Sequence, residues 1–399
     1  MTSVVTLKRE TFRAGQSWPI EDVLWQAEDR MRSAHATHLG YPYNLVGYSP
    51  VPASLGDYLV NNLGDPYVGS HYASHACDLE REAVDWLMDL WHCDEREKFW
   101  GSVGASGTEG NIWALYLARE AFPNAKLIYS REAHYSIPKA ARIMRMEAIA
   151  VECETSGAID IEAFAKALGA LDGSPVIVAL TCGTTVKGAH DDIAAVVACL
   201  DAAGLDPDRR FVHVDGALNA MVLPFAAGVP FAIQPSFRHG IDSLSTSGHK
   251  MIGTPMPCGV LIARRKHVDR VASAIAYLRS SDTTLMGSRN GHAVLSIWSR
   301  LIGHGANGYR ADVCACLART GRLVAALRSA GVPVLCNPHS FTVVFPTPGE
   351  TIVRTYQLAC NNGEAHAIVM PNVTDRLISR FVSDYLAWWK ASQRQGDPQ

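Results

Sequence analysis

Five segments of the 399-residue sequence place reactive side chains directly after short apolar runs that have the character of strands. They are GASGTEGN (104–111), REAHYS (131–136), TCGTTVKGA (181–189), HVDGA (213–217) and STSGHK (245–250). Their hydroxyls, imidazoles, carboxylate and amine are groups that perform acid–base and nucleophilic chemistry. Because open parallel α/β sheets bind ligands beyond the carboxyl ends of their strands, the five segments predict one ligand site at one sheet edge.

The carboxylate and the amine each have two interpretations. Asp215 follows the apolar residues FVHV, where a buried carboxylate needs a partner. It could cap a helix or form a structural ion pair, or it could be the counter-charge of a protonated ring nitrogen on a ligand. Lys250 lies among glycine and apolar residues in SGHKMIGTP. It is either a solvated surface charge or a desolvated amine, with a lowered pKa that suits Schiff-base formation.

The other groups complete a cofactor site. Ser106 and Thr108 precede a predicted helix, so they favour either a phosphate on free backbone N–H groups or an ordinary helix cap. His134 supplies a flat ring for stacking, and His213 is either a core histidine or a hydrogen-bond donor behind Asp215. A phosphate cup, a carboxylate for a pyridine nitrogen and a lysine for an aldehyde are the parts of a pyridoxal-phosphate (PLP) site.

The elements that must position these groups alternate between short strands and longer helices. Strands are predicted over 126–130, 148–153, 175–182, 211–215, 243–247 and 259–263, and helices over 108–121, 135–146, 160–170 and 191–204. Most of the strands are apolar at consecutive positions, as strands buried on both faces are. The alternation predicts an α/β fold, with a mostly parallel sheet sandwiched by helices.

Composition divides the chain into three predicted parts. An amphipathic helix over 17–33 and an irregular Gly/Pro/Asn/Tyr-rich passage belong to an N-terminal arm and substrate-side loop, 1–72. The large cofactor-binding domain is predicted over 73–295. A helix over 305–330, short strands and a final helix from Thr374 predict a small C-terminal α+β domain, 296–399.

Charge and cysteine content exclude several classes of protein. The chain has 36 basic and 39 acidic residues, a net charge of −3 and no basic block, which argues against nucleic-acid or membrane-surface partners. The 10 cysteines form no CxxC pair, so we expect neither a metal site nor a disulfide framework. No apolar stretch reaches the roughly 18 residues of a membrane span, and no targeting signal is found, so we expect a cytoplasmic protein.

Six segments also occur in the order in which one enzyme family has them: GTEGN, AHYS, GTTVKGA, HVDGA, SGHKMIGTPMPCG and GSRNGHA. Over roughly residues 40–380, the sequence resembles the group II PLP-dependent amino-acid decarboxylases, particularly bacterial histidine decarboxylases and plant serine decarboxylases. The resemblance implies a fold-type I PLP enzyme, similar to aspartate aminotransferase, that forms a homodimer with active sites at the subunit interface.

The resemblance also implies roles for individual residues. Lys250 would carry the cofactor, Asp215 would keep the pyridine nitrogen protonated, and the ring would lie between His134 and Ala217. Residues around the phosphate or the lysine would be Ser106, Gly107, Thr108, Thr184, Ser247 and His249, and Gly287 and Ser288 would reach the phosphate of the partner subunit. The loop after residue 61 would line the substrate pocket with Asn62, Asp65, Tyr67 and His71.

The implied reaction is decarboxylation of a small serine- or histidine-like L-amino acid to an amine and CO2, with the electrons taken up by the ring as a quinonoid. Tyr277 or His249 would then protonate Cα, although Tyr277 could instead be an interface aromatic. Three other reactions share the same scaffold: transamination, aldol cleavage and oxidative decarboxylation to an aldehyde. A non-catalytic family member is a further alternative, against which the presence of Lys250, Asp215 and His134 argues.

Overall fold

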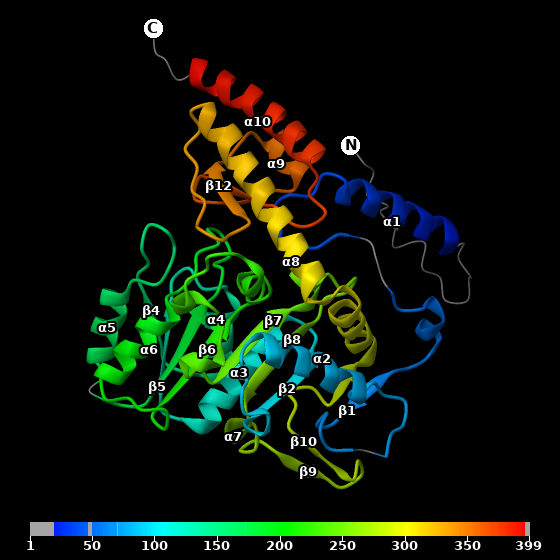
Figure 1. Ribbon diagram of the computed structural model, residues 1–399, viewed down its shortest axis with the longest axis vertical. Helices are drawn as coiled ribbons and strands as arrows, with labels where there is room; N and C mark the ends of the chain where they lie inside the picture. Colours follow the sequence, from blue (N-terminus) through cyan, green and yellow to red (C-terminus); the bar gives the residue numbers. More distant parts are fainter. Residues whose placement is uncertain (1–19, 47–49, 70, 172, 396–399) are drawn as a thin grey trace, which may run out of the picture.

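The computed structural model describes residues 20–46, 50–69, 71–171 and 173–395 (Figure 1). Within these residues a large α/β domain carries a smaller α+β domain, and one long helix, α8 (Gly291–Ser329), runs between them (Figure 1). None of the helices in this part of the chain is long and apolar enough to cross a membrane.

A seven-stranded sheet forms the centre of the large domain. Its strands are β2 (Phe99–Gly104), β3 (Lys126–Ser130), β4 (Ala148–Val151), β5 (Val176–Thr181), β6 (Arg210–Asp215), β7 (Ser243–Ser247) and β8 (Gly259–Arg264), in the order β2-β8-β7-β6-β5-β3-β4. The five strands from β4 to β7 pair in parallel, whereas β8 runs antiparallel to both β7 and β2. The predicted mostly parallel sheet is confirmed.

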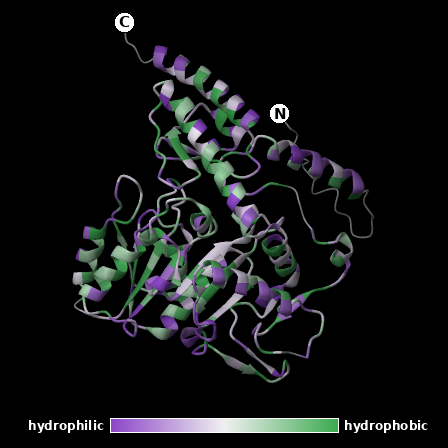
Figure 2. Cartoon of the chain, in the orientation of Figure 1, coloured by the Kyte–Doolittle hydropathy of each residue, from purple (hydrophilic) through white to green (hydrophobic). Residues whose placement is uncertain are grey.

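Helices cover both faces of this sheet. They are α2 (Cys77–Leu90), α3 (Gly107–Ala121), α4 (Ser136–Met144), α5 (Ile161–Gly169), α6 (Ile193–Ala202) and the short α7 (Arg265–Val268). One apolar cluster joins the sheet to α3, α4 and α7, and a second joins it to α2, α5 and α6. Every residue of β5 is buried, as expected of a strand covered on both faces, and Figure 2 shows the central strands largely in the hydrophobic colour.

Polar side chains begin three of the helices. Ser106, Asp160 and Asp192 each accept a hydrogen bond from the backbone N–H three residues further on, at 3.1, 3.0 and 2.8 Å. These bonds satisfy N–H groups that have no partner inside a helix. The predicted helices 108–121, 160–170 and 191–204 are confirmed, and they begin within two residues of their predicted starts.

Helix α8 crosses the predicted boundary between the large and small domains. It begins at Gly291 and continues through a kink at Gly305, whose φ of 64° favours a residue without a side chain. The helix predicted over 305–330 is therefore the second part of α8. The boundary predicted between residues 295 and 296 falls inside the first part of α8, which Asn290 caps at its N-terminus.

The small domain contains a three-stranded antiparallel sheet and two helices. The sheet has the order β12 (Thr342–Pro346), β14 (Glu364–Ile368) and β13 (Ala359–Asn361), and the helices are α9 (Glu350–Tyr356) and α10 (Asp375–Gln395). Phe381 and Tyr385 of α10 are fully buried, and the predicted final helix is present as α10.

The remaining elements are short, apart from α1, which lies at the upper right of Figure 1, whereas β9 and β10 lie at its lower edge. Helix α1 (Ile20–His35) has no buried residue, and the first positions of the helix predicted over 17–33 lie outside the described residues. Two short antiparallel pairs are β1 (Asn61–Leu63) with β11 (Ser288–Asn290) and β9 (Ser273–Ile275) with β10 (Ser280–Asp282). Short 3-10 turns occur at Ala53–Asp57, Arg96–Lys98, Asn219–Met221, Leu223–Phe225, Phe231–Ile233 and Phe237–His239.

Candidate active site

The five segments singled out in the sequence meet at one edge of the sheet. β3, β5, β6 and β7 are parallel neighbours, and β2 runs in the same direction because β8 is antiparallel to both β2 and β7. Ser106, His134, Thr184, Asp215 and Lys250 follow or end these five strands. The topology therefore brings the five segments to one edge of the sheet, and their joint role as a ligand site stays a prediction.

Lys250 lies in an irregular π-helical turn, Gly248–Ile252, directly after β7. Its own backbone, with φ −87° and ψ −119°, breaks the helical geometry of that turn. Gly248 packs closely beside it, since a Cβ at this position would lie 2.4 Å from the sulfur of Cys258. Burial lowers the pKa of the Lys250 amine, and the nearby Asp215 opposes that shift. The turn thus presents an amine that loses its proton more readily than a surface lysine does.

Asp215 is a buried carboxylate at the end of β6, with 3% of its surface exposed. Its Oδ1 accepts a hydrogen bond from the backbone N–H of Ala217 at 3.1 Å, and its Oδ2 accepts one from Asn111 Nδ2 at 2.7 Å. Among the described residues, no cationic group lies within ion-pair distance of this carboxylate. A buried negative charge with neutral partners alone is suited to a cationic ring nitrogen.

The N-terminus of α3 forms a narrow cup beside Ser247. Ser106 caps the helix, and the N–H groups of Gly107 and Thr108 fall in its first turn, where they have no partner within the helix. A Cβ at residue 107 would lie 2.4 Å from Ser247 Oγ and 3.6 Å from Ala217 Cβ. Only glycine fits at residue 107 without rearrangement, so no side chain covers the N–H groups of this turn, as a phosphate site requires.

His134 and His249 border the site from two different turns. His134 Nδ1 lies 2.8 Å from Ser136 Oγ, and burial lowers the pKa of its half-buried ring, with Lys250 adding to that shift and Asp215 opposing it. His249 Nδ1 accepts a hydrogen bond from the backbone N–H of Cys258 at 3.4 Å, and burial and Lys250 lower its pKa. Both rings are therefore neutral near pH 7, which suits stacking and hydrogen bonding rather than charge pairing.

Thr184 is buried in the turn after β5. Its Oγ1 accepts a hydrogen bond from the backbone N–H of Ala189 at 3.0 Å, which leaves its own hydroxyl proton for another acceptor. Because β5 and β6 are parallel neighbours, this turn places Thr184 at the same sheet edge as Asp215.

The substrate-side loop is held by its own polar residues. Asn62 donates a hydrogen bond to Glu80 at 2.7 Å and accepts one from the Ala76 backbone at 2.9 Å. Asp65 accepts hydrogen bonds from Trp100 Nε1 at 3.0 Å and from the Thr283 hydroxyl at 2.7 Å. Both side chains are buried, so their observed contacts hold the loop in place. Contact between them and the substrate stays a prediction.

The other residues predicted for this loop differ in exposure. Tyr67 packs at 6.5 Å from Trp100, and its buried hydroxyl has no hydrogen-bond partner among the described residues. His71 is exposed. A substrate role for these two residues also stays a prediction.

Three predicted residues face solvent in the protomer. Tyr277 lies between β9 and β10 with 86% of its surface exposed. Gly287 has no atom within 4 Å of the position of a Cβ, and Ser288, in β11, accepts a hydrogen bond from Asn61 at 3.2 Å. The structure does not bring these residues into contact with Lys250, so their roles in a partner's site stay predictions.

Sequence reasoning missed the residue that connects the site's polar groups. Asn111 was quoted in GTEGN without a role, yet it contacts Asp215, Ser136, Ser245 and His213. The available signal was a polar side chain four residues after Gly107, on the face of α3 that packs on the sheet.

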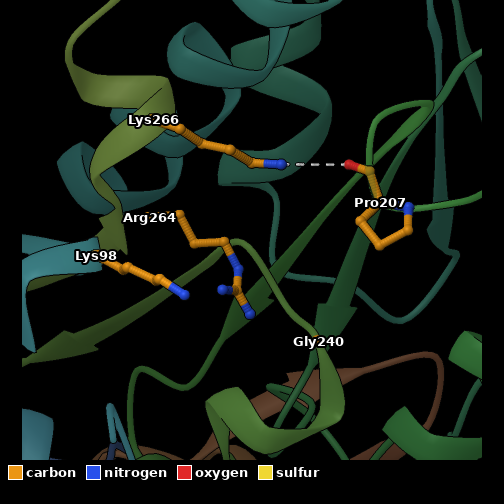
Figure 3. A pocket seen from close by; sticks show the side chains of 5 residues that line it. All are labelled: Lys98, Pro207, Gly240, Arg264 and Lys266. Carbon is orange, nitrogen blue, oxygen red and sulfur yellow. Dashed lines mark hydrogen bonds between the residues drawn. The ribbon is translucent and has the colours of Figure 1, made fainter. Parts of the chain in front are cut away.

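A pocket at the opposite edge of the sheet is a separate feature. It has a volume of about 300 Å³ and is lined by Lys98, Pro207, Gly240, Arg264 and Lys266 (Figure 3). Its cations are already paired, since Lys98 contacts Glu95 at 2.5 Å, Arg264 lies 3.7 Å from Asp242, and Lys266 lies 3.5 Å from Asp208. Arg264 ends β8 opposite Phe99 at the start of β2, so this pocket is remote from the polar sheet edge.

The comparisons with known proteins agree with this geometry. The sequence profile described as "Pyridoxal-dependent decarboxylase conserved domain" matches residues 43–346. The chain belongs to this family. Serine decarboxylase 1 of Oryza sativa subsp. japonica is 42% identical, over 87% of this chain and 71% of that protein. Histidine decarboxylase of Vibrio campbellii is 36% identical, over 87% of this chain and 90% of that protein.

A solved structure shares the fold of this pyridoxal-dependent decarboxylase. L-methionine decarboxylase from Streptomyces sp. 590 superposes with a TM-score of 0.82 and 24% identity, over 94% of this chain and 97% of that one. The fold is therefore that of a fold-type I PLP enzyme, and the cofactor is PLP. The residues at the sheet edge fit this cofactor, because they combine an uncompensated buried carboxylate, a desolvated lysine and a backbone cup for phosphate.

Proposed function

We propose that this PLP-dependent amino-acid decarboxylase acts on a small L-amino acid, serine or histidine, and releases the corresponding amine and CO2. The names of the relatives support these two substrates, and the relatives match most of the chain. The observation that carries the proposal is the arrangement of Lys250, Asp215 and the α3 N-terminus at one sheet edge.

The bound cofactor supplies an aldehyde for the substrate amine and a protonated ring that accepts the electrons of the bond to CO2. Lys250 offers an amine that loses its proton more readily than a surface lysine does, because burial lowers the pKa of its side chain. The Asp215 carboxylate holds a proton on the pyridine nitrogen. The backbone at Gly107 and Thr108 holds the phosphate, together with Ser106 and Ser247, and the neutral His134 and Ala217 pack against the ring.

The remaining residues of the site complete this proposal. Thr184 and His249 bind near the cofactor, and Gly287 and Ser288 reach the phosphate in the partner's site. Asn62, Asp65, Tyr67 and His71 form or support the substrate pocket.

His249 and Tyr277 are the rival proton donors to Cα. His249 is adjacent to Lys250 in the same protomer, whereas the exposed Tyr277 would act in the partner's site. His249→Gln and Tyr277→Phe separate the two. The donor is the residue whose replacement lowers kcat for amine formation at least about tenfold with PLP still bound, a typical loss for a general acid.

The chain works as a homodimer in this proposal. Helix α1 exposes 65% of Ile20, 63% of Leu24 and 68% of Trp25, and such a contiguous apolar face indicates a protein partner. Sedimentation should give twice the mass of 43.3 kDa, and a monomer with full activity would contradict this part. All 10 cysteines are free, which supports the reducing environment of the cytoplasm.

A substrate screen tests the function. The protein loaded with PLP is mixed with each of the common L-amino acids, and CO2, amine, aldehyde and peroxide are measured. We expect amine and CO2 in equal amounts from serine or histidine, and neither product from Lys250→Ala. Aldehyde with peroxide would instead show oxidative decarboxylation, and no product from any amino acid would contradict the proposal.

A further inference from the structure

Asn111 uses its whole hydrogen-bonding capacity inside the site. This residue of α3 is 1% exposed. Its Nδ2 donates to Asp215 Oδ2 at 2.7 Å and to Ser136 Oγ at 2.8 Å. Its Oδ1 accepts from Ser245 Oγ at 2.7 Å and from His213 Nε2 at 2.9 Å. A side-chain amide has two protons and two acceptor positions, so no further partner is possible.

This set of partners fixes the orientation of the amide. In the flipped orientation, the amide oxygen would face the Asp215 carboxylate, and two acceptors would meet without a proton. Burial also lowers the pKa of His213 to about 4, so its ring is neutral and has one proton. That proton lies on Nε2, which faces the Asn111 oxygen, while Nδ1 lies 2.9 Å from the Ser243 hydroxyl.

The same logic determines the tautomer of His134. The Ser136 hydroxyl oxygen accepts a hydrogen bond from Asn111, so its own proton is free to point at His134 Nδ1, 2.8 Å away. The backbone N–H of Ser136 also points at Nδ1, at 3.3 Å. Nδ1 is therefore an acceptor, and the neutral imidazole carries its proton on Nε2.

We propose that Asn111 is a positioning residue that holds Asp215 as a carboxylate and His134 as the Nε2–H tautomer. The inference rests on the proposed function, in which Asp215 pairs with the pyridine nitrogen of the cofactor and His134 packs against its ring. The hydrogen bond from Asn111 orients the Asp215 carboxylate. The bond that Asn111 donates to Ser136 leaves the Ser136 hydroxyl proton for His134 Nδ1, which keeps the proton of His134 on Nε2. The Asn111 amide thus acts on two groups from different parts of the sheet: Asp215 at the end of β6 directly, and His134 after β3 through Ser136.

The test compares variants that cut different arms of this network. Asn111→Leu removes all four hydrogen bonds of the amide. Ser136→Ala removes the hydroxyl that links Asn111 to His134. Ser245→Ala removes one bond to the Asn111 oxygen but keeps the bonds that Asn111 donates to Asp215 and Ser136. Histidine ring 13C and 15N shifts report the tautomer directly, with His134 assigned through His134→Gln. The full chain is measured before and after loading with PLP, and thermal melting shows which variants are folded.

We expect the Nε2–H signature for His134 in the wild type and in Ser245→Ala. In Ser136→Ala only the longer 3.3 Å bond from the backbone N–H of residue 136 still reaches Nδ1, so we expect a partial shift towards the Nδ1–H form. In Asn111→Leu the Ser136 hydroxyl oxygen becomes free to accept from Nδ1, so we expect a mixture of both forms. The kcat for decarboxylation should fall about tenfold in Asn111→Leu, because Asp215 loses a charge-assisted hydrogen bond. If Asn111→Leu is unfolded, Ser136→Ala still tests whether the Ser136 hydroxyl sets the tautomer of His134. A wild-type Nδ1–H signature, or no change in Ser136→Ala, would overturn the inference.

The tautomer measurement needs no turnover. A protein with the expected shifts but no decarboxylase activity would contradict the proposed function alone. An active decarboxylase with the wrong tautomer would contradict the role of Asn111 alone.

Discussion

Gly107 faces Ser247 so closely that a Cβ at residue 107 would lie 2.4 Å from the Ser247 hydroxyl oxygen. The cup at the N-terminus of α3 therefore accepts only glycine without rearrangement. A Ser247 hydroxyl can rotate away, but it then leaves the position in which it borders the phosphate cup. The close approach thus makes the glycine at residue 107 of α3 depend on the Ser247 side chain at the end of β7.

Gly107→Ala should weaken PLP binding about tenfold or more, because overpacking of this kind costs about 1–3 kcal/mol. A fluorescence titration of the protein with PLP measures the dissociation constant. Gly169→Ala is the matched control, since nothing lies within 4 Å of a Cβ there and binding should not change. Equal affinity of Gly107→Ala and the wild type would show that the cup is not tight.

Asp215→Asn preserves the size of the side chain but removes its charge. We expect kcat for decarboxylation to fall at least about 100-fold, because the ring nitrogen loses its counter-charge. Steady-state rates at saturating PLP provide the measurement, and bound PLP is quantified separately. Asp94→Asn, an exposed carboxylate paired with Arg238, should retain full activity. Activity of Asp215→Asn within about threefold of the wild type would remove Asp215 from the mechanism.

The buried ion pair between Arg289 and Glu80 should dominate the stability of the loop next to the site. Arg289 also donates to Ser102 at 2.9 Å and to the Gly64 backbone oxygen at 3.1 Å, so it joins β11, β2 and the substrate-side loop. Arg289→Met leaves Glu80 as an unpaired buried charge, which costs about 3–5 kcal/mol of unfolding free energy.

Denaturant unfolding measures this difference. Arg238→Met breaks a surface pair with Asp94 and should leave the unfolding free energy nearly unchanged. Similar losses of unfolding free energy in both variants would mean that the buried Arg289–Glu80 pair stabilises the protein no more than a surface pair does.

The stability of the protein should decline as the pH falls from about 6.5 to 4. Burial lowers the pKa values of His213 and His190 to about 4, so over this range the unfolded chain takes up protons that the folded chain does not. Asp191, with a pKa raised to about 6 by burial, acts in the opposite direction. The contribution of His213 corresponds to about 3 kcal/mol.

His213→Gln removes that titration, so its unfolding free energy should change less steeply with pH than that of the wild type. Chemical denaturation at a series of pH values gives the slopes. His35→Gln, at an exposed position of α1, should keep the wild-type slope. A His213→Gln slope as steep as that of the wild type would argue that this histidine is not held neutral.

The sequence predicts those parts of the structure that local patterns determine. The strand of residues 176–181 is apolar at nearly every position, and Asp160 and Asp192 are residues of a type that commonly precedes a helix. Because most of the strands are parallel, the polar segments after them meet at one sheet edge, and the position of Lys250 and Asp215 at this edge could be predicted in this way.

Contacts between distant positions could not be predicted in the same way. Asn111 meets Asp215 and Ser245 across separations of 104 and 134 residues, and these depend on the strand order. Gly305 marks a helix break in the sequence, yet α8 continues through it because packing on both sides supports the kink. Asn62 and Asp65 looked like substrate ligands, but their partners Glu80 and Thr283 are visible only in the fold.

We predict that Lys250 is the residue that holds PLP. Reduction of the loaded protein with borohydride fixes the cofactor to its lysine, and mass spectrometry of the digested protein identifies the peptide. We predict that the added mass lies on Lys250 alone, in the peptide that contains SGHK. Attachment to any other lysine, or an unmodified Lys250 in protein that binds PLP, would contradict the account.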